Sequence, residues 1–432
     1  MAPSPPPTQR CSDDPVLIIG AGISGLLLAQ HLLHRSVPFR IFDRDADFTT
    51  RGVGWGLTLH WSLPAIRTLL PDKLVQRLPE TYVDRDAVER GETSRFPLYD
   101  LATAKLEAAT PPATEAQRIR VTREGLRQLI AEDIPIEWSR AFSSFEQHGE
   151  RITVKFDDGS EATGRLVVGC DGSTSRVRRA VFPDQHRGYH LPIRVLGFTA
   201  KYTAPEIAPM KALDPFFLQA TSSQDNNFMY FSILDAPGNT PQPNKADSVS
   251  MYTGQVVVSW PYRSGFLYRD SPLDFPENED AKRALISSFA QAWAEPFRSV
   301  AMGVAASAEV KQLELQDYVP GEGLRSAGRV VLMGDAFHAM TMYRGEGANH
   351  AVLDVLDFSE KVSPCLETGE GDLRAALDVY EDGVVKRVRP AVLAARRACL
   401  DAHDWTRIMP TSPLLTRREA FMHYEETEPW EA

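Results

Sequence analysis

The chain has 432 residues, of which 43% are hydrophobic and 24% are charged, so it is long enough for two domains with buried cores. Its formal net charge of −11 argues against a nucleic-acid-binding protein, because such proteins gather lysine and arginine against phosphates. The four cysteines, Cys11, Cys170, Cys365 and Cys399, have neither metal-site nor disulfide spacing, which predicts a reducing, intracellular compartment and no metal centre.

The two ends of the chain predict no membrane anchor. Residues 1–14 are rich in proline and lack an apolar run, so they predict a disordered tail rather than a signal peptide. The most apolar stretch, residues 16–29, is shorter than the roughly 20 residues that a membrane span requires. Residues 401–432 are polar toward their end and predict a C-terminal extension. We therefore expect a cytoplasmic protein.

The first elements alternate between strand and helix. Residues 15–20 form a short β-branched run typical of a buried parallel strand, and residues 23–35 have helical periodicity. Residues 38–43 predict the next strand. This order predicts a βαβ unit at the start of the chain.

The middle of the chain has a different pattern. Residues 151–172 predict a hairpin that turns at Asp158-Gly159, followed by a buried strand. From residue 187 to residue 309, strands punctuated by proline, asparagine and glycine dominate, and a helix over about 280–298 closes the segment. This composition predicts a mixed or antiparallel sheet in a second domain.

The first pattern then returns. Residues 329–335 predict a buried strand and residues 348–362 a helix. The sequence therefore predicts an α/β protein whose first, Rossmann-like domain is discontinuous, made of residues 15–186 and 310–400. The mixed β-sheet domain, 187–309, is inserted into it, and helices follow at the C-terminal end.

A glycine-rich turn lies between the first predicted strand and helix. Gly20 permits a tight turn, Gly22 lets the backbone approach a pyrophosphate, and Gly25 lets helix and strand pack closely. The helix N-terminus offers free N–H groups to phosphates. Asp43 ends the second strand, where an acid can hold a ribose hydroxyl. These residues predict a dinucleotide site but do not separate FAD from NAD.

Two further motifs follow buried strands. Asp171-Gly172, with Ser175 after it, predicts a turn and a helix cap. Asp335 follows the strand at 329–335, where an acid can accept hydrogen bonds from ribityl hydroxyls. The glycine-rich segment 344–349 leads into a helix, whose N-terminus can face negative charge on a reduced flavin.

In order and spacing, these motifs resemble those of the single-component FAD-dependent aromatic hydroxylases, the group A flavoprotein monooxygenases that include parahydroxybenzoate and salicylate hydroxylases. Residues 334–351 read GDAFHAMTMYRGEGANHA, where fungal secondary-metabolism members commonly read GDAxHAMTPFRGEGxNHA. Arg123, in VTREGLRQLI, resembles the arginine with which the family contacts FAD. The resemblance covers about residues 15–400.

The resemblance implies a set of FAD-binding residues: Gly20, Gly22, Gly25, Asp43, Gly56, Arg123, Asp171, Asp335, Gly347, Ala348 and Asn349. The first four would hold the ADP half, and Asp335 would bind the ribityl-pyrophosphate region. Gly347 and Ala348, with Asn349, would face the isoalloxazine through backbone N–H groups. Asp171 resembles an aspartate that the family links to both FAD and NAD(P)H.

Two positions depart from the family pattern. Asp43 stands where the family usually has glutamate, and the shorter acid should still reach a ribose. Met342 stands where the family usually has a proline that shapes the loop beside the flavin. The second departure leaves the type of reaction open.

The resemblance implies an NAD(P)H- and O2-dependent monooxygenase. Such an enzyme would hydroxylate an aromatic or polyketide-like small molecule through a flavin C4a-hydroperoxide. The alternatives are a flavoenzyme of the same fold that performs epoxidation, Baeyer–Villiger oxidation or dehydrogenation on a polyketide or terpenoid-like substrate. A non-catalytic flavin-binding module is a third reading, which intact motifs at both ends of the flavin disfavour.

No catalytic acid or base is evident from the sequence. Arg194 is the candidate for steering a phenolate or carboxylate, because arginine stays charged and offers a fork of donors; a solvent-facing strand arginine is the plainer interpretation. His338 is better explained as a structural cap than as a general base. Several residues predict either a pocket lining or an ordinary core: Phe216, Phe217, Met229, Tyr230, Phe231 and Trp260.

Overall fold

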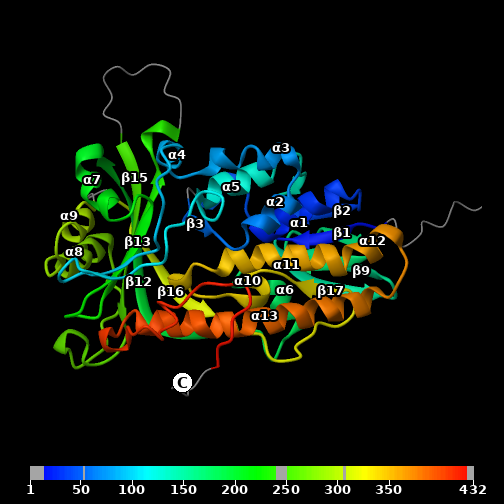
Figure 1. Ribbon diagram of the computed structural model, residues 1–432. Coiled ribbons are helices and arrows are strands. Elements are labelled where there is room, and N and C mark those ends of the chain that lie inside the picture. The colour runs from blue at the N-terminus through cyan, green and yellow to red at the C-terminus, as the bar shows by residue number, and fades with distance from the viewer. Residues whose placement is uncertain (1–13, 52–53, 240–250, 305–307, 426–432) are drawn as a thin grey trace, which may run out of the picture.

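The computed structural model describes residues 14–51, 54–239, 251–304 and 308–425. The proline-rich tail predicted over 1–14 lies outside the described residues, except for Asp14. The fold combines two large sheets with helices (Figure 1).

A five-stranded parallel sheet forms the first unit. Its strands are, in spatial order, β17 (Val330–Leu332), β11 (Leu166–Gly169), β1 (Val16–Ile19), β2 (Phe39–Phe42) and β7 (Ile136–Glu137). Apolar runs such as VLII in β1 are fully buried, as expected for a parallel sheet covered on both faces. The predicted βαβ unit is confirmed, with α1 (Ile23–His34) between β1 and β2. The carboxyl ends of the parallel strands meet at one edge.

Two small antiparallel sheets join this unit. The first contains β10 (Glu161–Gly164), β9 (Arg151–Phe156) and β8 (Phe142–His148). It includes the predicted hairpin, in which Gly159 has a φ of 81° that favours glycine. The second pairs β3 (Gly56–Leu59) with β6 (Ile119–Thr122).

A seven-stranded sheet forms the second unit. Its order is β16 (Lys311–Asp317), β12 (Tyr189–Thr203), β15 (Met251–Pro261), β14 (Phe228–Asp235), β13 (Phe217–Thr221), β4 (Leu98–Asp100) and β5 (Leu106–Ala108). Three of these strands lie outside the predicted range 187–309. β4 and β5 are too short to stand out in the sequence, and β16 joins the sheet by antiparallel pairing with β12.

The helices are α1 with α2 (Leu63–Leu69), α3 (Asp72–Val75), α4 (Arg85–Glu89), α5 (Arg123–Ile130), α6 (Arg176–Val181), α7 (Ala204–Leu213), α8 (Glu279–Ala290), α9 (Phe297–Met302), α10 (Asp335–His338), α11 (Gly347–Lys361), α12 (Ser363–Thr368) and α13 (Leu373–Asp401). The single helix predicted over 280–298 is in fact two, α8 and α9. α8 ends at Ala290, and Pro296 directly precedes α9, where proline's missing N–H and fixed φ disfavour continuing the preceding helix.

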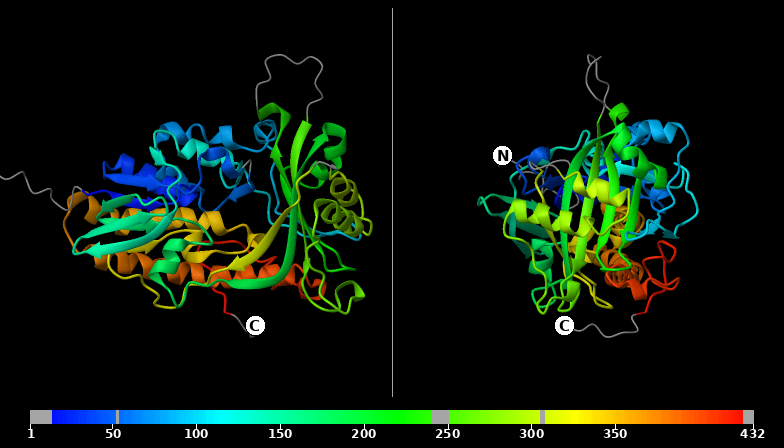
Figure 2. Two further views of the ribbon diagram at one scale, coloured as in Figure 1. Left: turned by 180° about the vertical axis from the view of Figure 1, so that it is seen from behind. Right: turned by 90° about the vertical axis from the view of Figure 1, so that its left-hand side faces the viewer.

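The long helix α13 links the two units. It runs beneath α11 from the parallel sheet to the seven-stranded sheet (Figures 1 and 2). Its last turns pack Ala398 and Cys399 against Ile193 and Val257 of the seven-stranded sheet. One helix therefore fixes the position of both sheets, and with it the space between them.

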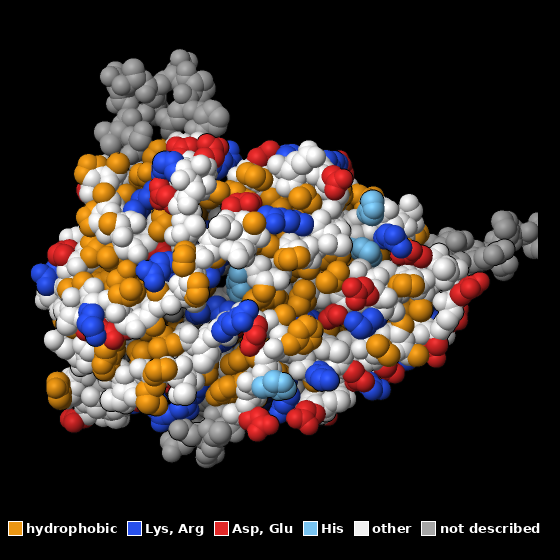
Figure 3. Space-filling model, in the orientation of Figure 1, with side chains coloured by type: hydrophobic (Ala, Val, Ile, Leu, Met, Phe, Trp, Pro, Cys, Tyr) orange, Lys and Arg blue, Asp and Glu red, His pale blue; other side chains and the backbone are white. Residues whose placement is uncertain are grey.

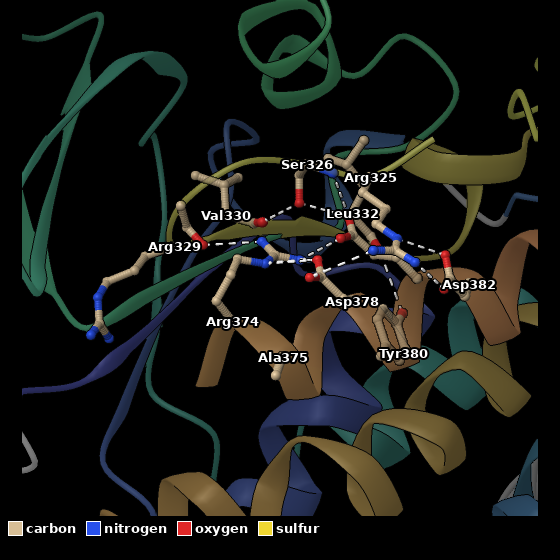
Figure 4. Close-up of polar contacts among 12 residues, drawn as sticks. Arg325, Ser326, Arg329, Val330, Leu332, Arg374, Ala375, Asp378, Tyr380 and Asp382 are labelled. Atoms are coloured by element: carbon tan, nitrogen blue, oxygen red, sulfur yellow. Dashed lines mark hydrogen bonds and ion pairs between the residues drawn. The ribbon is translucent and has the colours of Figure 1, made fainter. Parts of the chain in front are cut away.

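Polar contacts tie α13 to β17 as well (Figure 4). Tyr380 Oη donates to the carbonyl of Leu332 in β17 at 3.4 Å, Arg374 donates to the carbonyl of Gly328 before β17 at 3.0 Å, and Glu381 Oε1 accepts from Ser326 N, also before β17, at 2.9 Å. These contacts hold the edge strand that ends in the Gly334-Asp335 motif.

Charged side chains of both signs are interspersed with apolar ones over the face shown in Figure 3. In the described part of the chain, none of the helices combines the length and apolarity needed to span a bilayer.

Candidate active site

A cavity of about 450 Å³ lies between the parallel sheet and the seven-stranded sheet. Residues at the carboxyl ends of parallel strands line one part of it: Ile19, Phe42, Asp43, Cys170, Asp171 and Asp335. Residues of the seven-stranded sheet line another: Gln219, Tyr230, Gln255 and Leu313. Such a position, beyond the carboxyl ends of parallel strands, is where open α/β sheets bind ligands.

The cavity gathers most of the residues predicted to bind FAD: Gly20, Gly22, Asp43, Gly56, Arg123, Asp171, Asp335, Gly347 and Ala348. Gly25 and Asn349 do not line it. Both lie directly behind lining residues. Gly25 lets α1 pack closely against the Gly20 turn, and Asn349 joins α11 to β3.

The glycine turn has the geometry predicted for it. Gly20 has a φ of 109°, and a Cβ there would overlap the carbonyl of Cys170. A Cβ on Gly25 would overlap the carbonyl of Gly20, so its absence allows α1 to pack closely. A Cβ on Gly22 would meet nothing within 4 Å, so this glycine leaves room on the cavity side.

Asp43 is buried against that turn. Its carboxylate accepts hydrogen bonds from Ala21 N at 2.7 Å and from Asp45 N at 2.9 Å. Arg127 donates from Nε to the carbonyl of Ala21 at 2.7 Å and lies 3.7 Å from the Asp43 carboxylate. The acid and the turn are thus held as one rigid unit.

Asp171 caps α6. Its carboxylate accepts hydrogen bonds from Arg176 N at 2.7 Å, from Val177 N at 3.1 Å and from Ser175 Oγ. Burial raises the pKa of this carboxyl, and these hydrogen bonds act against that effect. The cap predicted from Asp171 and Ser175 is therefore present, at the cavity wall.

Asp335 follows β17 and opens into the cavity. The protein surrounds the carboxyl and raises its pKa by desolvation, yet the side chain is accessible from the cavity side. Arg123 and His338 are near enough to oppose this rise in pKa. A carboxylate in such a place is suited to accept hydrogen bonds from ligand hydroxyls.

The two glycines at the start of α11, Gly345 and Gly347, have different roles. Gly345 has the left-handed φ of 66°. Gly347 is the first residue of α11, and a Cβ there would lie 3.5 Å from Met340 Cγ, an ordinary contact distance. Gly347 therefore serves by leaving space in the cavity, not by adopting an unusual backbone conformation.

Asn349 fixes this loop from behind. Its Oδ1 accepts hydrogen bonds from His60 N at 3.0 Å and Ser62 Oγ at 2.8 Å, and its Nδ2 donates to the carbonyl of Thr58 at 2.9 Å. The side chain thus joins α11 to β3 and does not face the cavity.

The C-terminal segment holds the same loop. Arg344 donates to Glu346 Oε2 at 2.6 Å and to the carbonyl of Arg417 at 3.0 Å. Arg418 donates in return to the carbonyl of Arg344 at 2.8 Å. Residues 413–418 therefore act as a strap across the loop that enters α11.

His338 is part of a buried support for the Gly334 turn. Asp354 of α11 accepts hydrogen bonds from Gly334 N at 2.7 Å, contacts His338 Nε2 at 2.6 Å and pairs with Arg387 of α13 at 2.7 Å. Burial acts to raise the pKa of Asp354, but His338 and Arg387 hold it below its usual value. The structural interpretation of His338 agrees with these contacts.

Arg194 is not brought to the cavity, which corrects its candidacy as a steering residue. It lies on β12, where its Nε donates to Asp274 Oδ1 at 2.7 Å and its guanidinium lies 3.6 Å from the centre of the Tyr262 ring. Its partner is 80 residues away in the sequence, so the pairing had no local signal.

Arg120 is a buried cavity cation that sequence reasoning missed. It lies on β6, lines the cavity and is only 8% exposed. The one available signal was a charged residue inside the otherwise apolar alternation of 119–122. Of the aromatic candidates, Tyr230 lines the same cavity, whereas Phe217 lines a neighbouring one.

The residues at the cavity fit a flavin dinucleotide. α1 and α11 both begin at the cavity, and neither has a side-chain cap on its N-terminus, so backbone N–H groups remain for a ligand. The open glycines Gly22 and Gly347 leave space where backbone must approach a ligand. Asp43 and Asp335 supply acceptors for two sets of hydroxyls.

Comparison with known proteins agrees with this geometry. The family described as "FAD binding domain" matches residues 13–394. A probable FAD-dependent monooxygenase of Arthroderma benhamiae is 42% identical over 94% of this chain and 96% of its own length. The FAD-dependent monooxygenase dbaB of Emericella nidulans is 36% identical over 81% of this chain and 86% of its own length.

Two solved structures share the fold. The 2,6-dihydroxypyridine-3-hydroxylase of Arthrobacter nicotinovorans has a TM-score of 0.69 at 18% identity, over 97% of this chain and 99% of that one. Klebsiella pneumoniae HpxO, complexed with FAD and uric acid, has a TM-score of 0.66 at 20% identity, over 91% of this chain and 90% of that one.

Proposed function

Because the chain belongs to the FAD-binding family of FAD-dependent monooxygenases, we propose that it uses NAD(P)H and O2 to hydroxylate an aromatic, polyketide-like small molecule. The observation that carries the proposal is the continuity of the cavity. It runs from a dinucleotide-type glycine turn to the side chains of a separate sheet, without a break in its lining.

We assign the two ends of the cavity to FAD and to the substrate. Gly20, Gly22 and Asp43 would hold the ADP half of FAD, and Asp335 the ribityl chain. The N-terminus of α11, at Gly347 and Ala348, would meet the pyrimidine edge of the flavin ring. The domain boundaries proposed from the sequence, 15–186 with 310–400 for FAD and 187–309 for substrate, then need one addition. Strands β4, β5 and β16 also belong to the sheet at the substrate end, and β16 lies within the segment 310–400.

FAD, when bound, supplies the redox chemistry: it accepts a hydride from NAD(P)H and then activates O2. The protein contributes position and exclusion of water. The positive end of the α11 dipole and its uncapped N–H groups would stabilise negative charge on the reduced ring. The substrate would lie between that ring and the wall formed by Gln219, Tyr230 and Gln255.

The same site is compatible with other oxygen-transfer reactions, namely epoxidation and Baeyer–Villiger oxidation. The presence of Met342 is the reason to consider them. It is an exposed, flexible side chain in the loop beside α11, and it also lines the cavity. The pocket at the ring edge therefore differs from one shaped by proline, and this difference can change where on the substrate the oxygen is delivered.

Product analysis under labelled oxygen tests the proposal. The purified protein would be incubated with NADPH, isotopically labelled O2 and a panel of phenolic polyketides. We expect one labelled oxygen atom in a hydroxylated product. Turnover without label in the product would assign the protein to a dehydrogenase reaction instead.

A further inference from the structure

A second cavity, of about 320 Å³, adjoins the first and has no part in the function proposed above. Residues from 88–94 and 113–120 line it, together with Phe216 and Phe217. Arg120 lines both cavities, so at this point one side chain separates them. Several lining residues are exposed and give the second cavity its own opening to solvent: Gly91, Thr114, Glu115 and Ala116.

The first cavity opens mainly at its dinucleotide end. The exposed residues of its lining are Arg44, Thr174, Arg176, Asp335 and Met342. All of these except Met342 follow strands of the parallel sheet, where FAD would bind. Bound FAD would therefore cover this opening, and the substrate would have to reach the other end of the cavity by a different route.

Two phenylalanine rings form part of the wall between the cavities. Phe96 lines the first cavity and Phe217 lines the second. Their ring centres lie 4.7 Å apart, with the ring planes at 82°. A phenyl ring has no hydrogen-bonding group, so rotation of either side chain breaks no hydrogen bond. Such a rotation would open a connection between the two cavities.

Phe96 is held in an unfavourable backbone conformation. Its φ is 49°, in the left-handed region that bulky residues rarely adopt. Such conformations persist where neighbouring groups enforce them, and they gather at clamps and switches. Here the guanidinium of Arg418 lies 3.7 Å from the centre of the Phe96 ring, and that of Arg118 lies 5.6 Å from it. Because Arg418 also donates to the carbonyl of Arg344, it joins the ring to the C-terminal strap and to the loop before α11.

Met342 marks a competing route, because it is exposed and lines the first cavity. A wider opening there requires the loop before α11 to move. Arg344 of that loop is buried and donates to Glu346 Oε2 at 2.6 Å and to the carbonyl of Arg417 at 3.0 Å. Movement of the loop would break these hydrogen bonds, whereas rotation of the Phe96 side chain breaks none, so the wall at Phe96 opens at lower cost.

We propose that the second cavity is the entrance for the aromatic substrate, that Phe96 is its gate, and that Arg418 holds the gate closed. A flat aromatic molecule suits this passage, because it can replace the contacts that the Phe96 ring makes with Phe217 and with the guanidinium groups. The proposal rests on the proposed function, since it takes the dinucleotide end of the first cavity to be filled by FAD.

A thiol placed inside the first cavity reports which route is open. Gln255 lines the substrate end and is 3% exposed, so Gln255→Cys provides this thiol. The FAD-loaded variant is treated with N-phenylmaleimide, which carries an aromatic ring, or with the smaller reagent methyl methanethiosulfonate. Peptide mass spectrometry measures the rate of modification at position 255 separately from that of the native cysteines. This rate does not depend on turnover or on the identity of the substrate.

Further substitutions are combined with Gln255→Cys. Phe96→Ala removes the gate, Arg418→Gln removes the cation that holds it, and Ala116→Trp fills the entrance. Three controls are matched to them: Phe289→Ala removes a buried ring that lines neither cavity, Glu161→Trp adds the same bulk at an exposed position of β10, and Met342→Trp narrows the competing route.

If the gate is open for about 0.1–10% of the time, as is usual for a minor conformation, Phe96→Ala should speed modification by N-phenylmaleimide about ten- to a thousandfold. The smaller reagent should gain less. Arg418→Gln should act in the same direction. Ala116→Trp should slow modification with or without Phe96→Ala, and the three controls should match the Gln255→Cys parent.

The controls identify the results that would overturn the proposal. Equal acceleration by Phe289→Ala and Phe96→Ala would indicate general loosening of the fold. Slowing by Met342→Trp but not by Ala116→Trp would place the entrance beside α11. An unchanged rate in Phe96→Ala would exclude the gate, and an unchanged rate in Arg418→Gln would refute the role given to that cation.

The same measurement on the FAD-free protein separates the gate from the placement of FAD. Without FAD the dinucleotide end is open, so modification should be fast and Phe96→Ala should change it little. Equal acceleration by Phe96→Ala with and without FAD would support the gate and refute the placement of FAD over the other opening. Slower modification when FAD is bound, with no effect of Phe96→Ala, would support that placement and refute the gate.

Discussion

Two glycines at the entrance of α11 should respond to substitution in opposite ways. Gly345 has a φ of 66°, and a Cβ there would lie 3.3 Å from the Phe96 ring. Gly345→Ala should therefore lower the free energy of unfolding of the FAD-free protein by about 1–2 kcal/mol, the usual cost of a left-handed conformation for a residue with a side chain. Gly347 has no such constraint, and its Cβ would find only ordinary contacts.

Gly347→Ala should leave the FAD-free protein as stable as the wild type, or more stable by up to about 0.5–1 kcal/mol, because alanine favours a helix over glycine. Gly347→Val, however, should place methyl groups where the flavin ring must approach the α11 N-terminus. Losing one preorganised donor to a developing charge costs about 2.7–4 kcal/mol, so flavin reduction should slow by a hundred- to a thousandfold. FAD affinity should fall less, because Gly20, Gly22 and Asp43 hold the distant ADP half.

The assays are urea unfolding of the FAD-free protein, FAD titration, and stopped-flow reduction of bound FAD by NADPH with a phenolic substrate present. Gly345→Ala is the matched comparison for Gly347→Val, because the two positions share one loop. If Gly347→Val is reduced as fast as the wild type, α11 does not meet the flavin. If both glycine substitutions act only through stability, the distinction between their roles is incorrect.

Denaturation of the purified protein should release FAD and not FMN; release of FMN would contradict a dinucleotide site at Asp43. Asp335→Ala should weaken FAD binding by about 1.5–3 kcal/mol, whereas Cys170→Ala should change only packing; equal FAD titrations for the two would count against Asp335 as a ligand. Asp354→Ala should destabilise the fold by about 3–5 kcal/mol, because it removes one of the two carboxylates that pair with Arg387 and the buried acceptor of Gly334 N and His338. The exposed Asp274→Ala should cost at most about 1 kcal/mol, as measured by urea unfolding. Because the pKa of Asp354 is held below the usual value of an aspartate, the stability that Asp354 contributes is present above that usual value and is lost as the pH falls through the folded-state pKa. On acidification, the wild type should therefore lose stability faster than Asp354→Ala, and equal losses would contradict this assignment.

The glycine turn could be predicted from sequence because its determinants are local. Gly20, Gly22 and Gly25 lie between one strand and the helix that follows it, and their spacing specifies which glycine permits the turn and which permits packing. Asp43 follows the next strand of the same βαβ unit, so its distance from the turn was also determined locally.

The substrate end could not be predicted in the same way. Arg120 and Arg194 both lie on strands, and neither local pattern says which of them is buried. The hydrogen bond of Arg120 reaches a serine 112 residues later, and that of Arg194 reaches an aspartate 80 residues later. Pairings of this length depend on how the seven-stranded sheet assembles, and single-sequence patterns do not contain that information.

The strand order of the parallel sheet also determines at what point during translation the sheet can be completed. β1 leaves the ribosome early, but its neighbour β11 begins at Leu166 and the edge strand β17 only at Val330. α13, which ties β17 in place, ends at Asp401. The nascent chain must therefore carry an incomplete sheet with an open apolar edge until nearly all of it has been translated. Such intermediates are prone to aggregate, so we expect the yield of folded protein to depend more on chaperones during translation than the stability of the finished fold would suggest.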